Sequence, residues 1–212
     1  MAKRAKRRVT ARIRKAAIAD APAIQALVNH FAGQRQMLSR SLSEIYENVR
    51  DFFVAEKGGA VIGSAALHVF WGDLAEVRAL AVSQKYQGRG LGTRLLRACI
   101  KEAREMGMKR VFALTFQARF FEGLGYEPVS KDALPHKVWS DCIKCPMFPN
   151  CDETAVMLDL ERPARRRAPT ANVATTSEDE SAGISRQRGG GSKAVAVGRH
   201  EKRHPRRQGS SK

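Results

Sequence analysis

The apolar positions of the first fifty residues predict one short strand and two helices. Residues 13–17 fit the strand, and residues 20–31 repeat apolar side chains at the spacing of a single helical face. That face consists of Ile24, Leu27, Val28 and Phe31. We expect Asp20 to cap this helix, because a side-chain oxygen in that position can accept from the free amides of the first turn. Ser41 and Glu44 have the spacing of a capping box, which predicts a second, short helix.

The middle of the chain predicts a hairpin, a buried strand and a long amphipathic helix. Residues 52–55 and 60–70 are strand-like segments on either side of a Lys-Gly-Gly turn. Residues 76–82 are rich in aliphatic side chains, as a buried strand would be. The helix that follows repeats apolar side chains at Leu91, Leu95, Leu96, Cys99 and Ile100. Gly107 stands where the C-terminal cap of a helix is preferred.

The segment after this helix predicts further strands and one short helix. Residues 110–115 fit a strand, and residues 117–124 fit a short helix that ends at Gly125. The remaining strand pieces are residues 126–129, 136–139 and 155–160. The order of elements, β-α-α-β-β-β-α-β-α-β-β, indicates one α/β domain, which we place at residues 12–161.

A glycine-rich hexapeptide, Gln87 to Gly92, joins the predicted buried strand to the long helix. Strand, glycine turn and helix place backbone N–H groups around a phosphate, because glycine lets the backbone approach an anion and a helix N-terminus carries partial positive charge. The spacing is neither that of a nucleoside-triphosphate P-loop nor that of a dinucleotide fold. The alternative is a turn that binds no ligand, although three glycines in five residues cost backbone entropy without packing anything.

The spacing Gln87-x-x-Gly90-x-Gly92 resembles the pyrophosphate loop of the GNAT acetyltransferase superfamily. Within it the chain is similar to the acetyltransferase domain of N-acetylglutamate synthase, through the segments AEVRALAV at 75–82, FALT at 112–115 and FFEGLGY at 120–126. The resemblance covers about residues 12–161. It implies the GNAT fold, a mixed central sheet of about six to seven strands flanked by helices, with acetyl-CoA as co-substrate. It implies the short, stand-alone form, without a regulatory kinase domain.

The resemblance also implies which residues form the site. An amine acceptor arrives mostly as an ammonium ion, so its attack on a thioester needs a base. Glu76 matches the family's glutamate and is the candidate catalytic base, although it could instead form an ion pair with Arg78, which lies on the same side of the strand. A dicarboxylic acceptor needs cations or hydrogen-bond donors for its carboxylates, and the candidates are Arg14, Arg35, Arg40, Arg78, Lys137 and Gln117. We favour Arg78 and Gln117, because they lie on segments that flank the cleft. The cofactor candidates are Leu80, Ala81 and Val82 for the pantetheine arm, and Gln87, Gly88, Arg89, Gly90, Leu91, Gly92 and Thr93 for the pyrophosphate.

One position departs from the wider superfamily. Many members carry a tyrosine that protonates the leaving thiolate where this chain has Phe121, but the glutamate-synthase subgroup also has phenylalanine there. Tyr126 follows a glycine turn, and we expect it in the core.

Three functions remain open from the sequence. The first is acetylation of the α-amino group of L-glutamate, the entry to arginine biosynthesis, by direct transfer in a ternary complex. The second is acetylation of another amine, such as a protein N-terminus, a lysine, a polyamine or a small molecule. The third is a nucleic-acid-associated protein with a vestigial site, which an intact glycine loop and Glu76 disfavour.

The net charge of +17 is concentrated at the two ends of the chain. Residues 1–11 hold five Lys/Arg and no acidic residue, and residues 163–212 hold twelve against four Asp/Glu. We expect residues 1–11 and 162–212 to be disordered basic tails, because they offer almost no large apolar side chain to a core. Such tails either solubilise the protein or bind nucleic acid weakly. We expect a cytoplasmic protein without a membrane segment, and a homodimer stays open.

Four cysteines occur, and three of them fall in one loop. Cys142, Cys145 and Cys151 have a ligand-like spacing, but a zinc site usually needs four ligands, so His136, Asp141 or Asp152 would have to complete it. We expect no metal. The alternatives are a proline-braced loop whose reduced thiols line the acceptor side of the cleft, and a redox switch.

Overall fold

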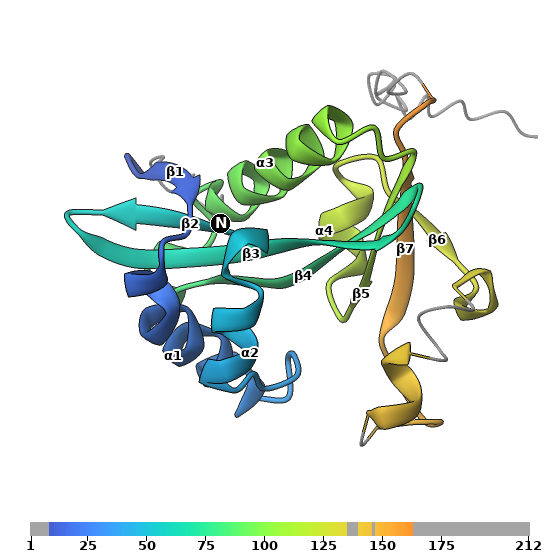
Figure 1. The fold of residues 1–212 in the computed structure, drawn as a ribbon, viewed down its shortest axis with the longest axis horizontal. Coiled ribbons are helices and arrows are strands. Elements are labelled where there is room, and N and C mark those ends of the chain that lie inside the picture. The colour runs from blue at the N-terminus through green and yellow to red at the C-terminus, as the bar shows by residue number, and fades with distance from the viewer. Residues whose placement is uncertain (1–8, 135–139, 146, 163–212) are drawn as a thin grey trace, which may run out of the picture. The chain divides into compact units, whose positions relative to one another are not determined.

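The computed structural model describes residues 9–134, 140–145 and 147–162. In these residues a seven-stranded sheet has the order β1-β2-β3-β4-β5-β7-β6, with helices on both faces (Figure 1). The strands are β1 (Arg12–Lys15), β2 (Phe52–Lys57), β3 (Ala60–Trp71), β4 (Leu74–Val82), β5 (Arg110–Thr115), β6 (Glu127–Val129) and β7 (Thr154–Asp159). The helices are α1 (Ala21–Ala32), α2 (Leu42–Glu47), α3 (Leu91–Glu105) and α4 (Ala118–Glu122). The short 3-10 turns are η1 (Ile18–Asp20), η2 (Val49–Asp51), η3 (Gln84–Tyr86), η4 (Lys131–Ala133) and η5 (Cys142–Lys144).

This architecture confirms the predicted α/β fold and the mixed sheet of six to seven strands. Every predicted element that falls on described residues is present, with ends shifted by a few residues. The predicted strand piece at 136–139 lies outside the described residues, as do residues 1–8 and 163–212 of the predicted tails.

The sheet opens between its two central strands. β4 and β5 are parallel and pair only from Leu74–Arg110 to Glu76–Phe112, although β4 continues to Val82 and β5 to Thr115. The neighbouring pairs, β3–β4 and β5–β7, are antiparallel and longer. Beyond Glu76 the two strands therefore separate, and this opening positions the site.

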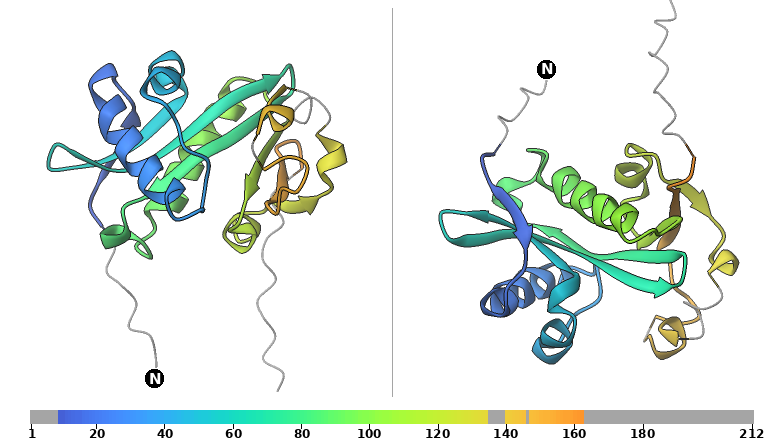
Figure 2. Two further views of the ribbon diagram at one scale, coloured as in Figure 1. Left: turned by 90° about the horizontal axis from the view of Figure 1, so that it is seen from below. Right: turned by 45° about the horizontal axis from the view of Figure 1, so that its top comes forward.

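Helix α3 covers one face of the sheet and buries the predicted apolar stripe (Figure 1, Figure 2). Its buried side chains are Leu91, Leu95, Leu96, Cys99, Ile100 and Ala103. They pack against the inward side chains of β3, β4 and β5, among them Leu67, Val77 and Val111. The helix ends before Gly107, whose φ of 76° is the left-handed conformation of a C-terminal glycine.

Helices α1 and α2 cover the opposite face (Figure 1). Ile24 and Val28 of α1 and Ile45 of α2 pack on Val54 and Ala66 of the sheet. The capping box is confirmed, because Ser41 Oγ accepts from Glu44 N at 3.1 Å and Ser41 N donates to Glu44 Oε2 at 2.7 Å.

Asp20 is the N-cap residue of α1, as predicted, but the predicted role of its side chain is wrong. Its carboxylate makes no capping bond to α1. Asp20 Oδ2 instead accepts from Ala17 N at 2.7 Å and from Arg14 Nη1 at 2.6 Å. The hydrogen bond from Arg14 is the largest cause that lowers the pKa of Asp20 below its usual value. The Asp20 carboxylate therefore binds Arg14 of β1 and Ala17 N instead of the free amides at the start of α1.

Candidate active site

The glycine loop lies at the N-terminus of α3, after the end of β4. Gly88 and Gly90 have φ values of 69° and 81°, a conformation that favours glycine, and Gly90 is the N-cap residue of the helix. The N–H of Arg94 already donates to Gly90 O at 3.1 Å. The amides of Leu91, Gly92 and Thr93 precede the first intrahelical donor, so the loop presents N–H groups and the positive end of the helix dipole to an anion.

Other side chains of the loop have structural contacts. Gln87 Nε2 donates to Val82 O at 3.0 Å, which fixes the loop to the end of β4. Leu91 is buried in the core, so only its backbone is available to a ligand. Arg89 is half-buried, and its Nε is buried with no hydrogen-bond partner among the described residues. Arg94 donates from its guanidinium to Val9 O and Ala11 O, and so braces the chain before β1 rather than adding charge to the loop.

The backbone of β4 changes conformation just before the segment expected to meet the pantetheine arm. Ala79 has a φ of 52°, which is uncommon for a residue other than glycine, and the β3–β4 register shifts here. Ser64 Oγ donates to Ala79 O at 3.2 Å and stabilises the irregularity from β3. Beyond it, Leu80, Ala81 and Val82 form the end of β4 along the opening of the sheet.

A pocket lies on the α1 and α2 side of this opening. We call it the acceptor pocket, and it is lined by Met37, Leu38, Arg40, Glu76, Val77, Arg78, Ala79, Leu114, Asp141, Cys142, Cys145, Phe148, Cys151 and Glu153. The lining combines an apolar surface with two arginines and three carboxylates. Charged groups of both signs suit a small zwitterionic molecule better than an apolar one.

Glu76 and Arg78 lie together in the acceptor pocket. Glu76 is 4% exposed, and its Oε2 is 3.1 Å from Arg78 Nε. Asp141 Oδ2 lies 4.0 Å from Arg78 Nη2. Both contacts are ion pairs, but Nε and Nη2 of Arg78 are buried and have no hydrogen-bond partner among the described residues. The guanidinium is therefore charge-compensated while its donors stay available to an acceptor oxygen.

The two residues predicted to bind the acceptor have different positions. Arg78 lines the pocket, whereas Gln117 is exposed at the N-terminus of α4, where its backbone N–H donates to Thr115 Oγ1. The pocket contains Arg40 instead, from the segment before α2. Sequence reasoning included Arg40 among several possible cations but could not rank it, because only the fold brings that segment over β4.

A histidine lies beside Glu76 on the same face of the sheet. His68 of β3 is directly opposite Glu76 in the antiparallel register. Its Nδ1 is 2.8 Å from Asp51 Oδ2, so the ring is held toward η2. This pair adds a polar neighbour to Glu76 outside the lining of the acceptor pocket.

Tyr126 lies in the core, as predicted. It is 2% exposed, packs edge-on against Phe121, and its hydroxyl is buried with no hydrogen-bond partner among the described residues. Burial raises its pKa far above the usual value. A hydroxyl in this position is unsuited to giving a proton to a leaving group in the cleft.

The cysteines of the loop lie at the acceptor pocket. Cys142, Cys145 and Cys151 are half-buried, form no disulfide among the described residues and line the pocket. In the part of the chain that the structure describes, no group of three or more His, Cys, Asp or Glu side chains is arranged to hold a metal ion.

Among the described residues, no helix combines the length and apolarity that a membrane span requires.

Comparison with known proteins connects this geometry to a family. The sequence model of the acetyltransferase (GNAT) family matches residues 23–126. An uncharacterized N-acetyltransferase of Chlorobaculum tepidum is 40% identical over 148 residues, 70% of this chain and 96% of that protein. An amino-acid acetyltransferase of Mycobacterium tuberculosis is 36% identical over 132 residues, 61% of this chain and 75% of that protein.

A solved structure agrees with these relatives. N-acetylglutamate synthase of Neisseria gonorrhoeae, complexed with coenzyme A and N-acetyl-glutamate, has a TM-score of 0.66 and 31% identity. The match covers 74% of this chain and 36% of that one. The shared fold, the glycine loop at the opened sheet and the sequence identity together show that this chain belongs to the GNAT acetyltransferase family and is an N-acetyltransferase that uses acetyl-CoA.

Proposed function

We propose that the protein acetylates the α-amino group of L-glutamate by direct transfer from acetyl-CoA in a ternary complex. The product would be N-acetylglutamate, with which arginine biosynthesis begins. The name of the M. tuberculosis protein supports an amino-acid acceptor, and that of the N. gonorrhoeae protein supports glutamate.

The observation that carries the proposal is the buried guanidinium of Arg78. Its side chain is 18% exposed, and its buried Nε and Nη2 have no hydrogen-bond partner among the described residues. Leaving such donors without acceptors costs free energy, which a bound carboxylate would recover. Arg40, the second cation in the pocket, would meet the other carboxylate of a dicarboxylic amino acid.

Glu76 is the proposed base. It would take a proton from the acceptor ammonium, and the freed amine would attack the thioester carbonyl. A C–N bond forms, the C–S bond breaks, and coenzyme A leaves as a thiolate. Tyr126 is buried away from solvent and Phe121 has no hydroxyl, so the thiolate would take its proton from water or from the acceptor nitrogen.

The cofactor would lie along the end of β4. Its pyrophosphate would accept from the amides of residues 88–93, with Arg89 beside it, and its pantetheine arm would follow the backbone of Leu80, Ala81 and Val82. This arrangement brings the thioester toward Glu76, where β4 and β5 separate.

An acceptor panel tests the proposal. Acetyl-CoA turnover is measured with L-glutamate, D-glutamate, L-glutamine, L-leucine, spermidine and a lysine-containing peptide, and acetylated products are identified by mass spectrometry. We expect kcat/KM for L-glutamate to exceed the others. Arg78→Lys keeps the charge but loses the fork, so it should raise the KM for glutamate roughly 10- to 100-fold, the range for a lost hydrogen bond to a charged group. A higher kcat/KM for spermidine or the peptide would identify a different acceptor class.

A further inference from the structure

Three of the four cysteines line the acceptor pocket, and the proposed transfer reaction uses none of them. Cys142, Cys145 and Cys151 are half-buried and form no disulfide among the described residues. The fourth, Cys99, is on the buried face of α3, and burial raises its pKa to about 12. The chain thus has accessible thiols at its pocket and one inaccessible thiol that can act as an internal control.

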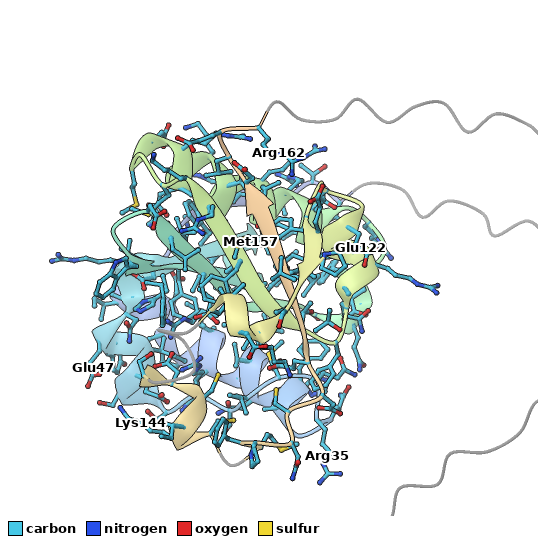
Figure 3. The ribbon with its side chains drawn as sticks, turned by 90° about the vertical axis from the view of Figure 1, so that its right-hand side faces the viewer. Arg35, Glu47, Glu122, Lys144, Met157 and Arg162 are labelled. Atoms are coloured by element: carbon cyan, nitrogen blue, oxygen red, sulfur yellow. The ribbon has the colours of Figure 1, made fainter. Side chains whose placement is uncertain are left out.

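Two of the pocket thiols stand at the ends of a single turn. Cys142 begins η5 and Cys145 follows it, and Cys145 N donates to Cys142 O at 3.0 Å. A turn closed by such a bond brings its end Cα atoms within about 7 Å. Disulfides span Cα separations of roughly 4.4–6.8 Å, so this pair lies within or close to bonding range. Figure 3 shows the turn by its labelled residue Lys144.

This turn is connected to the residue proposed to bind the acceptor. Asp141 directly precedes Cys142, and its Oδ2 is 4.0 Å from Arg78 Nη2. Further along the loop, Lys131 Nζ donates to Cys151 O at 2.6 Å, which ties this part of the loop to η4. Tightening the turn would therefore move Asp141 relative to Arg78 while the far side of the loop stays held.

We propose that Cys142 and Cys145 form an oxidisable dithiol whose disulfide state weakens acceptor binding. The oxidant is a low-molecular-weight disulfide, RSSR. One cysteine thiolate attacks RSSR and releases one RS⁻, and the second thiolate attacks the mixed disulfide and releases the other. The two cysteine sulfurs lose two electrons and two protons in total, and RSSR becomes two RSH. The formation of the disulfide does not depend on which acceptor the enzyme uses, whereas its effect on KM rests on the proposed acceptor pocket.

The test oxidises the full chain with excess oxidised glutathione and then alkylates it under native conditions. Peptide mass spectrometry identifies linked cysteines, and Cys99 reports on folding because it should be alkylated only after denaturation. Steady-state kinetics before and after oxidation use direct detection of the acetylated amino acid, since thiol-release reagents would react with glutathione. Cys142→Ser, Cys145→Ser and the control Cys151→Ser are treated identically.

We expect a Cys142–Cys145 disulfide, an acceptor KM raised at least about tenfold, and an unchanged KM for acetyl-CoA. Dithiothreitol should reverse the change, Cys142→Ser and Cys145→Ser should be insensitive to oxidation, and Cys151→Ser should respond like the wild type. The proposal is overturned if both thiols stay free, if Cys151 replaces either partner, or if oxidation leaves the acceptor KM unchanged. If glutamate is not acetylated, the proposed acceptor fails while the mass measurement still decides the dithiol.

Discussion

The substitution Glu76→Gln separates proton removal from acceptor binding at the centre of the proposed mechanism. It keeps the shape of the side chain and its position on β4 but removes the negative charge and the basicity. Glu76 is 4% exposed and its Oε2 lies 3.1 Å from Arg78 Nε, so the change also removes one partner of a buried ion pair.

Two magnitudes follow from this geometry. A positioned base contributes about 10²- to 10⁴-fold to the rate, and kcat should fall by that factor. Removing one partner of a buried ion pair costs roughly 3–5 kcal/mol of unfolding free energy. Asp141 remains 4.0 Å from Arg78, so we expect a loss at or below the lower end of that range. Domains of this kind have roughly 5–15 kcal/mol to lose, and the variant should stay folded.

The assay is single-turnover acetylation at saturating acceptor, followed across the pH range in which the wild type is folded. The variant should react about 10²- to 10⁴-fold more slowly than the wild type, while its affinity for acetyl-CoA stays near that of the wild type. Glu153→Gln is the matched control, because it removes another carboxylate of the same pocket. If single-turnover rates nearly recover at high acceptor concentration, Glu76 positions the ammonium and is not the base.

Three further predictions concern the glycine loop, the core and acid stability. Gly90→Val should weaken acetyl-CoA binding at least about tenfold, as measured by calorimetry. The control Gly59→Val should not, although Gly59 has a similar positive φ and equally open space around it. Equal losses of affinity in the two variants would mean that backbone strain alone causes the effect. Tyr126→Phe should leave kcat unchanged and the thermal midpoint of unfolding equal or higher, because it removes a buried hydroxyl that has no hydrogen-bond partner among the described residues. A large loss of kcat would instead identify this hydroxyl as the proton donor. The pKa of Asp20 is lowered in the folded state, so its contribution to stability is present above about pH 4 and is lost at lower pH. Asp20→Asn should therefore be less stable than the wild type at neutral pH and should lose less stability on acidification. A stability difference between the two proteins that stays the same at all pH values would contradict this.

The fold could be predicted from sequence wherever the signal was local. The apolar stripe of α3, the Ser41–Glu44 capping box and the Lys-Gly-Gly turn each depend on a few neighbouring residues, and each is present. Gly88 and Gly90 have positive φ values, a conformation that their residue type permits.

The features that the sequence did not predict depend on residues that are distant in the sequence. Asp20 has the residue type of a cap, but Arg14 reaches it from β1. Arg40 lines the acceptor pocket and Gln117 does not, because the side of the cleft that each segment faces depends on the whole fold. Ala79 adopts a positive φ with no signal in its residue type, since the register of β3 and β4 imposes it.

The parting of β4 and β5 would let one short segment serve both substrates of the proposed reaction. Glu76 pairs with Phe112 as the last contact between the strands, so it lies where the opening begins. The glycine loop starts after the far end of β4 and would bring the cofactor back along that strand. The acceptor pocket reaches the same point from the α1 and α2 face, through Arg78 two residues later. Under the proposed mechanism, the position of Glu76 at the last strand pair would suit it to act between the two substrates.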